Sequence, residues 1–108
     1  MSSTNLNNEK AYEESMQKYI NLIKPHFKFN YSGFNTQGGI GWELRNDSDS
    51  ITIYLWYFDK SIHDDLLPEN FDKNKTYDIA IQIESANDDV VKTFENVDLA
   101  IKHLQQKN

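Results

Sequence analysis

The stretch Ser50 to Lys60, "SITIYLWYFDK", constrains the fold more than any other part of the chain. Successive side chains of a β-strand point to opposite faces, so this stretch predicts a strand with two apolar faces. One face carries Ile51, Ile53, Leu55 and Tyr57, and the other, here called the aromatic face, carries Tyr54, Trp56 and Phe58. A second apolar face must be covered either by the rest of the chain or by a partner.

The rest of the chain predicts helices before and after a group of strands. Apolar side chains at spacings of three and four indicate a helix from Glu9 that ends before Pro25. Alternation predicts a strand through residues 77–84, and Asn96 is placed to cap a closing helix. At 108 residues the chain fits one domain. We therefore expect a two-layer α+β domain over residues 9–108, with three or four antiparallel strands and both helices on one face, after a flexible lead-in of residues 1–8.

The polar cluster from Asn46 to Asp49 predicts a hairpin turn between two strands. If Asn46 pairs with Asp49, glycines face the large aromatic side chains, which is a favourable arrangement because rings can fold across a strand without side chains. The predicted pairs are Leu44 with Ile51, Trp42 with Ile53, Ile40 with Leu55, Gly41 with Tyr54 and Gly39 with Trp56. A short strand through Phe27 and Phe29 and one helical turn near Pro68 are further expectations.

Composition narrows the class of protein. There is no cysteine, which excludes disulfides and thiolate chemistry and fits a reducing, cytoplasmic setting. The first ten residues show no basic and apolar segments typical of a secretory signal, and no apolar stretch approaches the ~20 residues of a membrane helix. We expect no membrane association.

Acidic residues are concentrated after the aromatic strand. The formal net charge is −6, and residues 59–98 hold eleven acidic and four basic side chains. Such a surface repels a phosphate backbone and attracts a basic protein. Solvated surface charge is the plain alternative explanation.

No pattern in the sequence identifies an enzyme. His63 with Asp64 and Asp65 lacks the spacing of metal ligands, and His26 and His103 belong to separate elements. The "GGIG" run has Leu44 where a nucleotide-binding fingerprint needs its third glycine. We expect no catalytic residues, no metal and no cofactor.

The aromatic face has three interpretations: it is covered by the 59–76 segment or another part of the chain, it is a homodimer interface, or it recognises a partner. Its aromatic side chains are similar to those that stack bases in RNA-recognition domains, but the acidic charge argues against nucleic acid.

Our main hypothesis is a non-enzymatic inhibitor, of the immunity or anti-defence kind, that occludes a basic surface of a partner protein. The alternative is a chaperone-like or ligand-binding module that docks peptide or single-stranded nucleic acid. The predicted partner-binding residues are Tyr54, Trp56, Phe58, Asp64, Asp65, Glu69 and Asp72.

Overall fold

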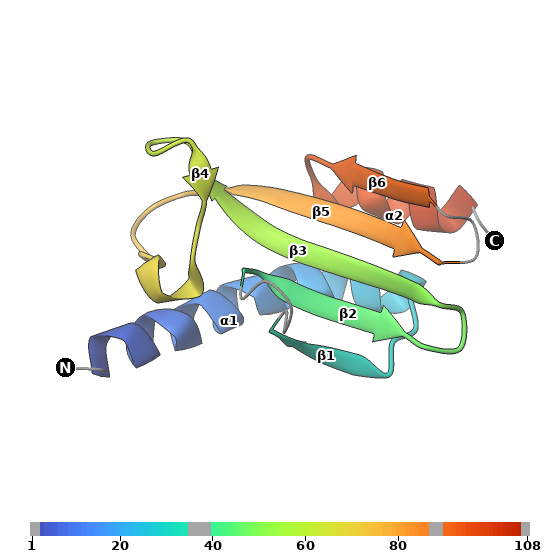
Figure 1. Ribbon diagram of the computed structural model, residues 1–108, viewed down its shortest axis with the longest axis horizontal. Coiled ribbons are helices and arrows are strands. Elements are labelled where there is room, and N and C mark those ends of the chain that lie inside the picture. The colour runs from blue at the N-terminus through green and yellow to red at the C-terminus, as the bar shows by residue number, and fades with distance from the viewer. Residues whose placement is uncertain (1–2, 35–39, 87–89, 107–108) are drawn as a thin grey trace.

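A computed structural model describes residues 3–34, 40–86 and 90–106 (Figure 1). Two helices and an antiparallel sheet form an α+β fold, as predicted. The helices are α1 (Ser3–Ile23) and α2 (Val97–Gln106), and two short 3-10 turns are η1 (Lys24–His26) and η2 (Pro68–Asn70). The strands are β1 (Tyr31–Phe34), β2 (Trp42–Asn46), β3 (Ile51–Asp59), β4 (Asp64–Asp65), β5 (Asp78–Ser85) and β6 (Val90–Phe94).

Helix α1 follows the predicted apolar spacing but starts earlier than expected. It begins at Ser3 rather than Glu9, and it gives way to η1 at Lys24, beside the proline that was expected to end it. Its inward side chains, Tyr12, Met16, Ile20 and Ile23, are buried. The helix therefore packs along the stripe that the sequence indicates.

The sheet has six strands among the described residues, which corrects the expectation of three or four. Its order is β1-β2-β3-β5-β6, and β4 pairs with the end of β3. The additional strands are short: β1 lies at Tyr31–Phe34 rather than through Phe27 and Phe29, and β4 has only two residues. Segments of this length carry too little alternation to be recognised in a sequence.

The β2–β3 register differs from the predicted one by two residues. Asn46 pairs with Ile51, Leu44 with Ile53 and Trp42 with Leu55, so the turn contains four residues. Side-chain hydrogen bonds between Asn46 and Asp49 close this turn, which the prediction had treated as a strand pair. Because the shift is even, each side chain stays on the face to which it was assigned. The pairs of Gly41 with Tyr54 and Ile40 with Leu55 were wrong, and Gly39 lies outside the described residues.

The segment between β3 and β5 is anchored by two side chains. Leu66 and Phe71 are buried against the core, and η2 forms the helical turn expected near Pro68. Ile62, by contrast, is 62% exposed at the tip of the β3–β4 hairpin. The segment is thus fixed near η2 and projects from the body at β4 (Figure 1).

One hydrophobic cluster holds the domain together. It combines α1 side chains with Ile53, Leu55 and Tyr57 of β3, and with Val97, Ala100 and Leu104 of α2. The predicted cap of α2 is confirmed, because the Asn96 Oδ1 accepts a 3.0 Å hydrogen bond from the backbone N–H of Leu99.

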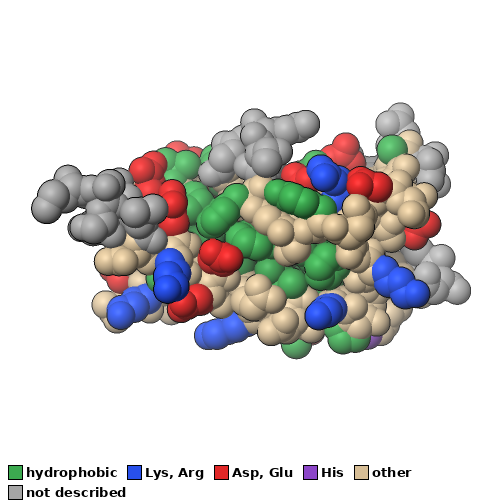
Figure 2. All heavy atoms as spheres, turned by 90° about the horizontal axis from the view of Figure 1, so that it is seen from below, with side chains coloured by type: hydrophobic (Ala, Val, Ile, Leu, Met, Phe, Trp, Pro, Cys, Tyr) green, Lys and Arg blue, Asp and Glu red, His purple; other side chains and the backbone are tan. Residues whose placement is uncertain are grey.

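The side of the molecule along α1 and β1 carries both signs of charge. Figure 2 shows a band of hydrophobic side chains across the middle of this side, with Lys or Arg and Asp or Glu scattered around it. None of the helices in the described part of the chain is long and apolar enough to span a bilayer.

Candidate functional site

The aromatic face runs along the middle strand of the sheet and is partly open to solvent. Tyr54, Trp56 and Phe58 are each partly exposed, whereas Leu55 and Tyr57 between them are buried. The alternation of β3 explains this difference, since the buried side chains belong to the hydrophobic cluster and the aromatic face points away from it. Three large rings therefore lie in a row on a rigid strand with solvent access.

Trp56 is oriented by its neighbours on the sheet. Its indole Nε1 donates a 2.9 Å hydrogen bond to Asp65 Oδ1 of β4. On the β5 side its partner is Ala80, whose small side chain leaves room beside the ring. On the β2 side the backbone of Gly41 approaches so closely that a Cβ there would lie 2.8 Å from Cβ of Trp56. The 59–76 segment thus touches the aromatic face at Asp65 and leaves Trp56 partly exposed.

Tyr54 lies among charged side chains. It pairs with Glu43 of β2 and with Gln82 of β5. Burial raises the pKa of the Tyr54 hydroxyl, and the negative charges of Glu84 and Glu43 raise it further. Carboxylates therefore border this end of the aromatic face.

Phe58 marks an acidic end of the same face. It pairs with Asp65 on one side and with Asp78 on the other. Lys60 Nζ lies 3.2 Å from Asp78 Oδ2, so one of these two carboxylates has a cationic partner. Because both groups of that pair are largely exposed, the ion pair contributes little stability.

Asp64 lies next to the turn of the β3–β4 hairpin, one residue before Asp65. It pairs with Asp59 across the hairpin, and its Oδ1 accepts a hydrogen bond from the backbone N–H of Asp65. A hydrogen bond from the Ser61 hydroxyl lowers the pKa of Asp59. Asp64 is thus an exposed charge beside Asp65, and its pairing with Asp59 places it on the strand position that alternates with the aromatic face.

The other two predicted acidic residues lie near α1. The backbone carbonyl of Glu69 accepts a 2.8 Å hydrogen bond from the Asn8 side chain. Asp72 lines a shallow hollow with Asn8 and Ala11 of α1, and its carboxylate accepts a hydrogen bond from the backbone of Asn74. The structure therefore brings Asp65 to the aromatic side chains, places Asp64 next to it in the hairpin, and places Glu69 and Asp72 near α1.

A second aromatic and charged group on this sheet face was not anticipated. The Arg45 guanidinium lies 4.6 Å from the centre of the Tyr31 ring, and its Nη1 is 3.1 Å from Glu43 Oε2. Arg45 Nε also lies 3.2 Å from Asp47 Oδ1. Direct pairing puts Tyr31 beside Arg45 and Glu43 beside Tyr54, so the group continues the aromatic face toward β1. The alternation within β2 places Glu43 and Arg45 on this face, and it was visible in the sequence. Tyr31 could not be placed there because β1 was not predicted.

The described part of the chain holds no set of three or more His, Asp or Glu side chains arranged to bind a metal ion. His63 is exposed in the β3–β4 hairpin with a φ of 51°, a left-handed conformation that serves the turn.

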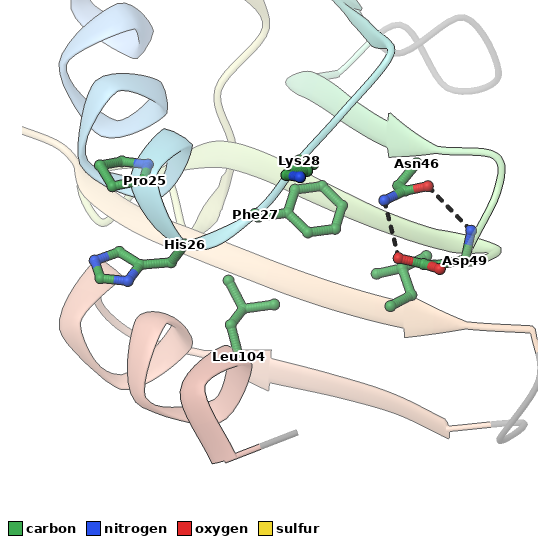
Figure 3. Close-up of a pocket in the computed structure, with 8 residues that line it drawn as sticks. Pro25, His26, Phe27, Lys28, Asn46, Asp49 and Leu104 are labelled. Atoms are coloured by element: carbon green, nitrogen blue, oxygen red, sulfur yellow. Dashed lines mark hydrogen bonds between the residues drawn. The ribbon is translucent and has the colours of Figure 1, made fainter. Parts of the chain in front are cut away.

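A cavity of about 330 Å³ lies among η1, the β2–β3 turn and α2. Its walls include His26, Phe27 and Leu104, with Asn46 and Asp49 bonded to each other on the opposite side (Figure 3). Because Asn46 and Asp49 close the turn, their polar groups already have a structural role.

Comparisons of this chain with protein-family models, with curated proteins and with solved structures find no match.

Proposed function

We propose that this chain is a small acidic, non-enzymatic binding protein that inhibits a partner protein by covering a basic functional surface, in the manner of an immunity or anti-defence protein. The observation that carries this proposal is the row of partly exposed rings on β3 with carboxylates at both ends. Aromatic anchors with a polar border are typical of protein–protein interfaces.

The proposal requires the sheet face that contains the aromatic face to be free of the helices. We infer that both helices cover the opposite face. Side chains of α1 and α2 share one cluster with Ile53, Leu55 and Tyr57. Both helices also pass behind the strands in the view of Figure 1.

The rings and the charges have different roles in this mechanism. Trp56, Tyr54 and Phe58 provide apolar area that is removed from water in the complex, and Trp56 is oriented in advance by Asp65. Asp65 beside the rings and the adjacent exposed Asp64, together with the net charge of −6, attract a basic partner and speed association. Glu69 and Asp72 contribute to this long-range attraction without touching the aromatic anchors.

The test is affinity capture from the native cell with a matched pair of surface variants. Ala80→Arg places a bulky side chain beside Trp56, at a position that is already partly exposed, and should abolish capture of the partner. Leu22→Arg changes an exposed side chain on α1 and should capture the partner as well as the original chain does. Equal capture by both variants would contradict binding through the aromatic face. Circular dichroism checks that each variant is folded.

Substitution of Trp56, the middle ring of the three, measures how much the aromatic face contributes to the affinity for the partner. With the captured partner purified, Trp56→Ala should weaken binding by about 30-fold or more, which corresponds to about 2 kcal/mol. Reversal of the Asp64 charge should mainly slow association and reduce its salt dependence.

Single-stranded oligonucleotides and unrelated peptides should leave the tryptophan fluorescence unchanged. Saturable binding of either would favour the ligand-docking alternative, and loss of self-association in Ala80→Arg would favour a homodimer.

A further inference from the structure

The geometry points to recognition of an arginine side chain by Trp56 and Asp65, which rests on the proposed function and names the chemistry of its anchor. In this arrangement the partner's guanidinium stacks on the indole and donates hydrogen bonds to the carboxylate.

Asp65 is a carboxylate without a cationic partner in the described structure. Its Oδ1 accepts a hydrogen bond from a neutral indole N–H, and no Lys or Arg of the described residues lies within ion-pair distance of it. Its neighbour on the other side of Phe58, Asp78, is paired with Lys60. A partly buried carboxylate gains most from a charged donor that approaches with well-directed N–H groups.

Trp56 places an aromatic surface next to that carboxylate. The 2.9 Å bond from Nε1 to Asp65 Oδ1 restricts the rotation of the indole and keeps its edge at the carboxylate. Tryptophan attracts cations over its ring more strongly than other aromatic residues do. A planar guanidinium can stack on the ring and still reach the carboxylate with its edge, whereas an ammonium group cannot do both.

The same sheet face already holds one arginine in this way. Arg45 lies over Tyr31 at 4.6 Å and forms ion pairs with Glu43 and Asp47. Trp56 and Asp65 repeat the aromatic ring and the carboxylate, and the cation would come from the partner. The small Ala80 beside Trp56 leaves space for it, while the backbone of Gly41 closes the other side.

The experiment is a titration of the full chain with N-acetyl-arginine amide, followed by the indole N–H signals in ¹H–¹⁵N NMR spectra. The chain has two tryptophans, and the indole of Trp42 is bonded to Ser32 on the core side, so it serves as an internal control. The Trp56 signal should shift and saturate with a dissociation constant on the order of millimolar, and the Trp42 signal should not move. Citrulline amide, which has the same shape without the charge, should give no saturable shift.

Asp65→Asn isolates the charge, because its amide oxygen can still accept the indole hydrogen bond. This variant should bind the arginine probe about tenfold more weakly. Asp98→Asn removes the same charge at an exposed position in the first turn of α2 and should bind it normally. Equal shifts with arginine and citrulline, equal affinity for a lysine probe, or unchanged binding by Asp65→Asn would each overturn the assignment.

The two proposals fail in different ways. If Ala80→Arg abolishes partner capture while Asp65→Asn neither weakens it nor changes the titration, the binding face stands and the arginine assignment is wrong. If the titration behaves as expected while Ala80→Arg still captures the partner, the aromatic face does not bind that partner and the proposed function is wrong.

Discussion

Gly41 is the residue that lets the chain before β2 approach the aromatic face. Its φ of 88° lies in the left-handed region, and a Cβ at this position would be 2.3 Å from the backbone oxygen of Leu55. The oxygen belongs to the middle strand and cannot move aside easily. We expect Gly41→Ala to lower the free energy of unfolding by about 2 to 4 kcal/mol, measured by urea unfolding.

Gly33 provides the matched control for that substitution. The nearest atom to a Cβ there is the hydroxyl oxygen of Tyr31, at the far end of a side chain that can rotate away. Gly33→Ala should therefore change the free energy of unfolding by less than about 1 kcal/mol. Equal effects of the two substitutions would show that the close approach of Gly41 to β3 is not a constraint on stability.

The contact between Trp56 and Asp65 shows how far residue-scale prediction could go. Both residues were predicted as parts of one binding site, and the structure joins them by a hydrogen bond. The same prediction grouped Glu69 and Asp72 with them on the basis of charge alone. Those two residues follow Leu66, whose burial turns the chain toward α1. Sequence proximity within a long connection does not determine on which face each charge lies.

At the level of elements, the faces of the strands were predictable and their register was not. A strand's faces follow from its own alternation, which needs no knowledge of its neighbour. The register depends on the turn, and the bonds between Asn46 and Asp49 produce a turn of four residues. The two-residue error preserved the aromatic face, because only an odd shift exchanges the two faces of a strand.

The start of α2 permits a separate prediction. Asn96 Oδ1 accepts the N–H of Leu99, one of the backbone groups that a helix leaves without partners at its first turn. We expect Asn96→Ala to lower the free energy of unfolding by about 1 kcal/mol. Asn96→Asp keeps the acceptor and should retain the stability of the original chain. Thermal unfolding followed by circular dichroism would measure both, and an Asp variant as unstable as the Ala variant would contradict a capping role.

At the scale of the whole molecule, the predicted α+β class was right because it depends on apolar patterns that can be read directly from the sequence. Two apolar helical stripes and several alternating segments require one shared core, and the structure provides a single cluster for them. The short strands β1 and β4 were missed, since their positions are set by β2 and β3 beside them rather than by their own residues.

The hydrophobic cluster contains two buried tyrosines, Tyr12 and Tyr57. They should make the free energy of unfolding fall as the pH rises above 10. Burial raises the pKa of Tyr57 to about 12, partly opposed by its hydrogen bond with Ser15. Burial also raises the pKa of Tyr12, whose hydroxyl lies near the Tyr57 backbone but forms no hydrogen bond of good geometry with the described residues. In the unfolded chain both hydroxyls lose their protons near pH 10. Below pH 10 both hydroxyls keep their protons in the folded and in the unfolded state. Between pH 10 and pH 12 the unfolded state loses protons that the folded state keeps, so the free energy of unfolding should fall by about 1 to 3 kcal/mol.

Phenylalanine variants separate the effect of Tyr12 and Tyr57 from the titration of the other groups at alkaline pH. At pH 7 Tyr12→Phe should leave the free energy of unfolding unchanged or raise it, because it removes a hydroxyl without a described partner. Tyr57→Phe should cost about 1 kcal/mol, because it removes the hydrogen bond with Ser15. The double variant should lose much less stability between pH 10 and pH 12 than the original chain, in urea unfolding at fixed ionic strength. An unchanged loss would place the alkaline sensitivity outside Tyr12 and Tyr57, since lysines and the other four tyrosines also titrate in this range.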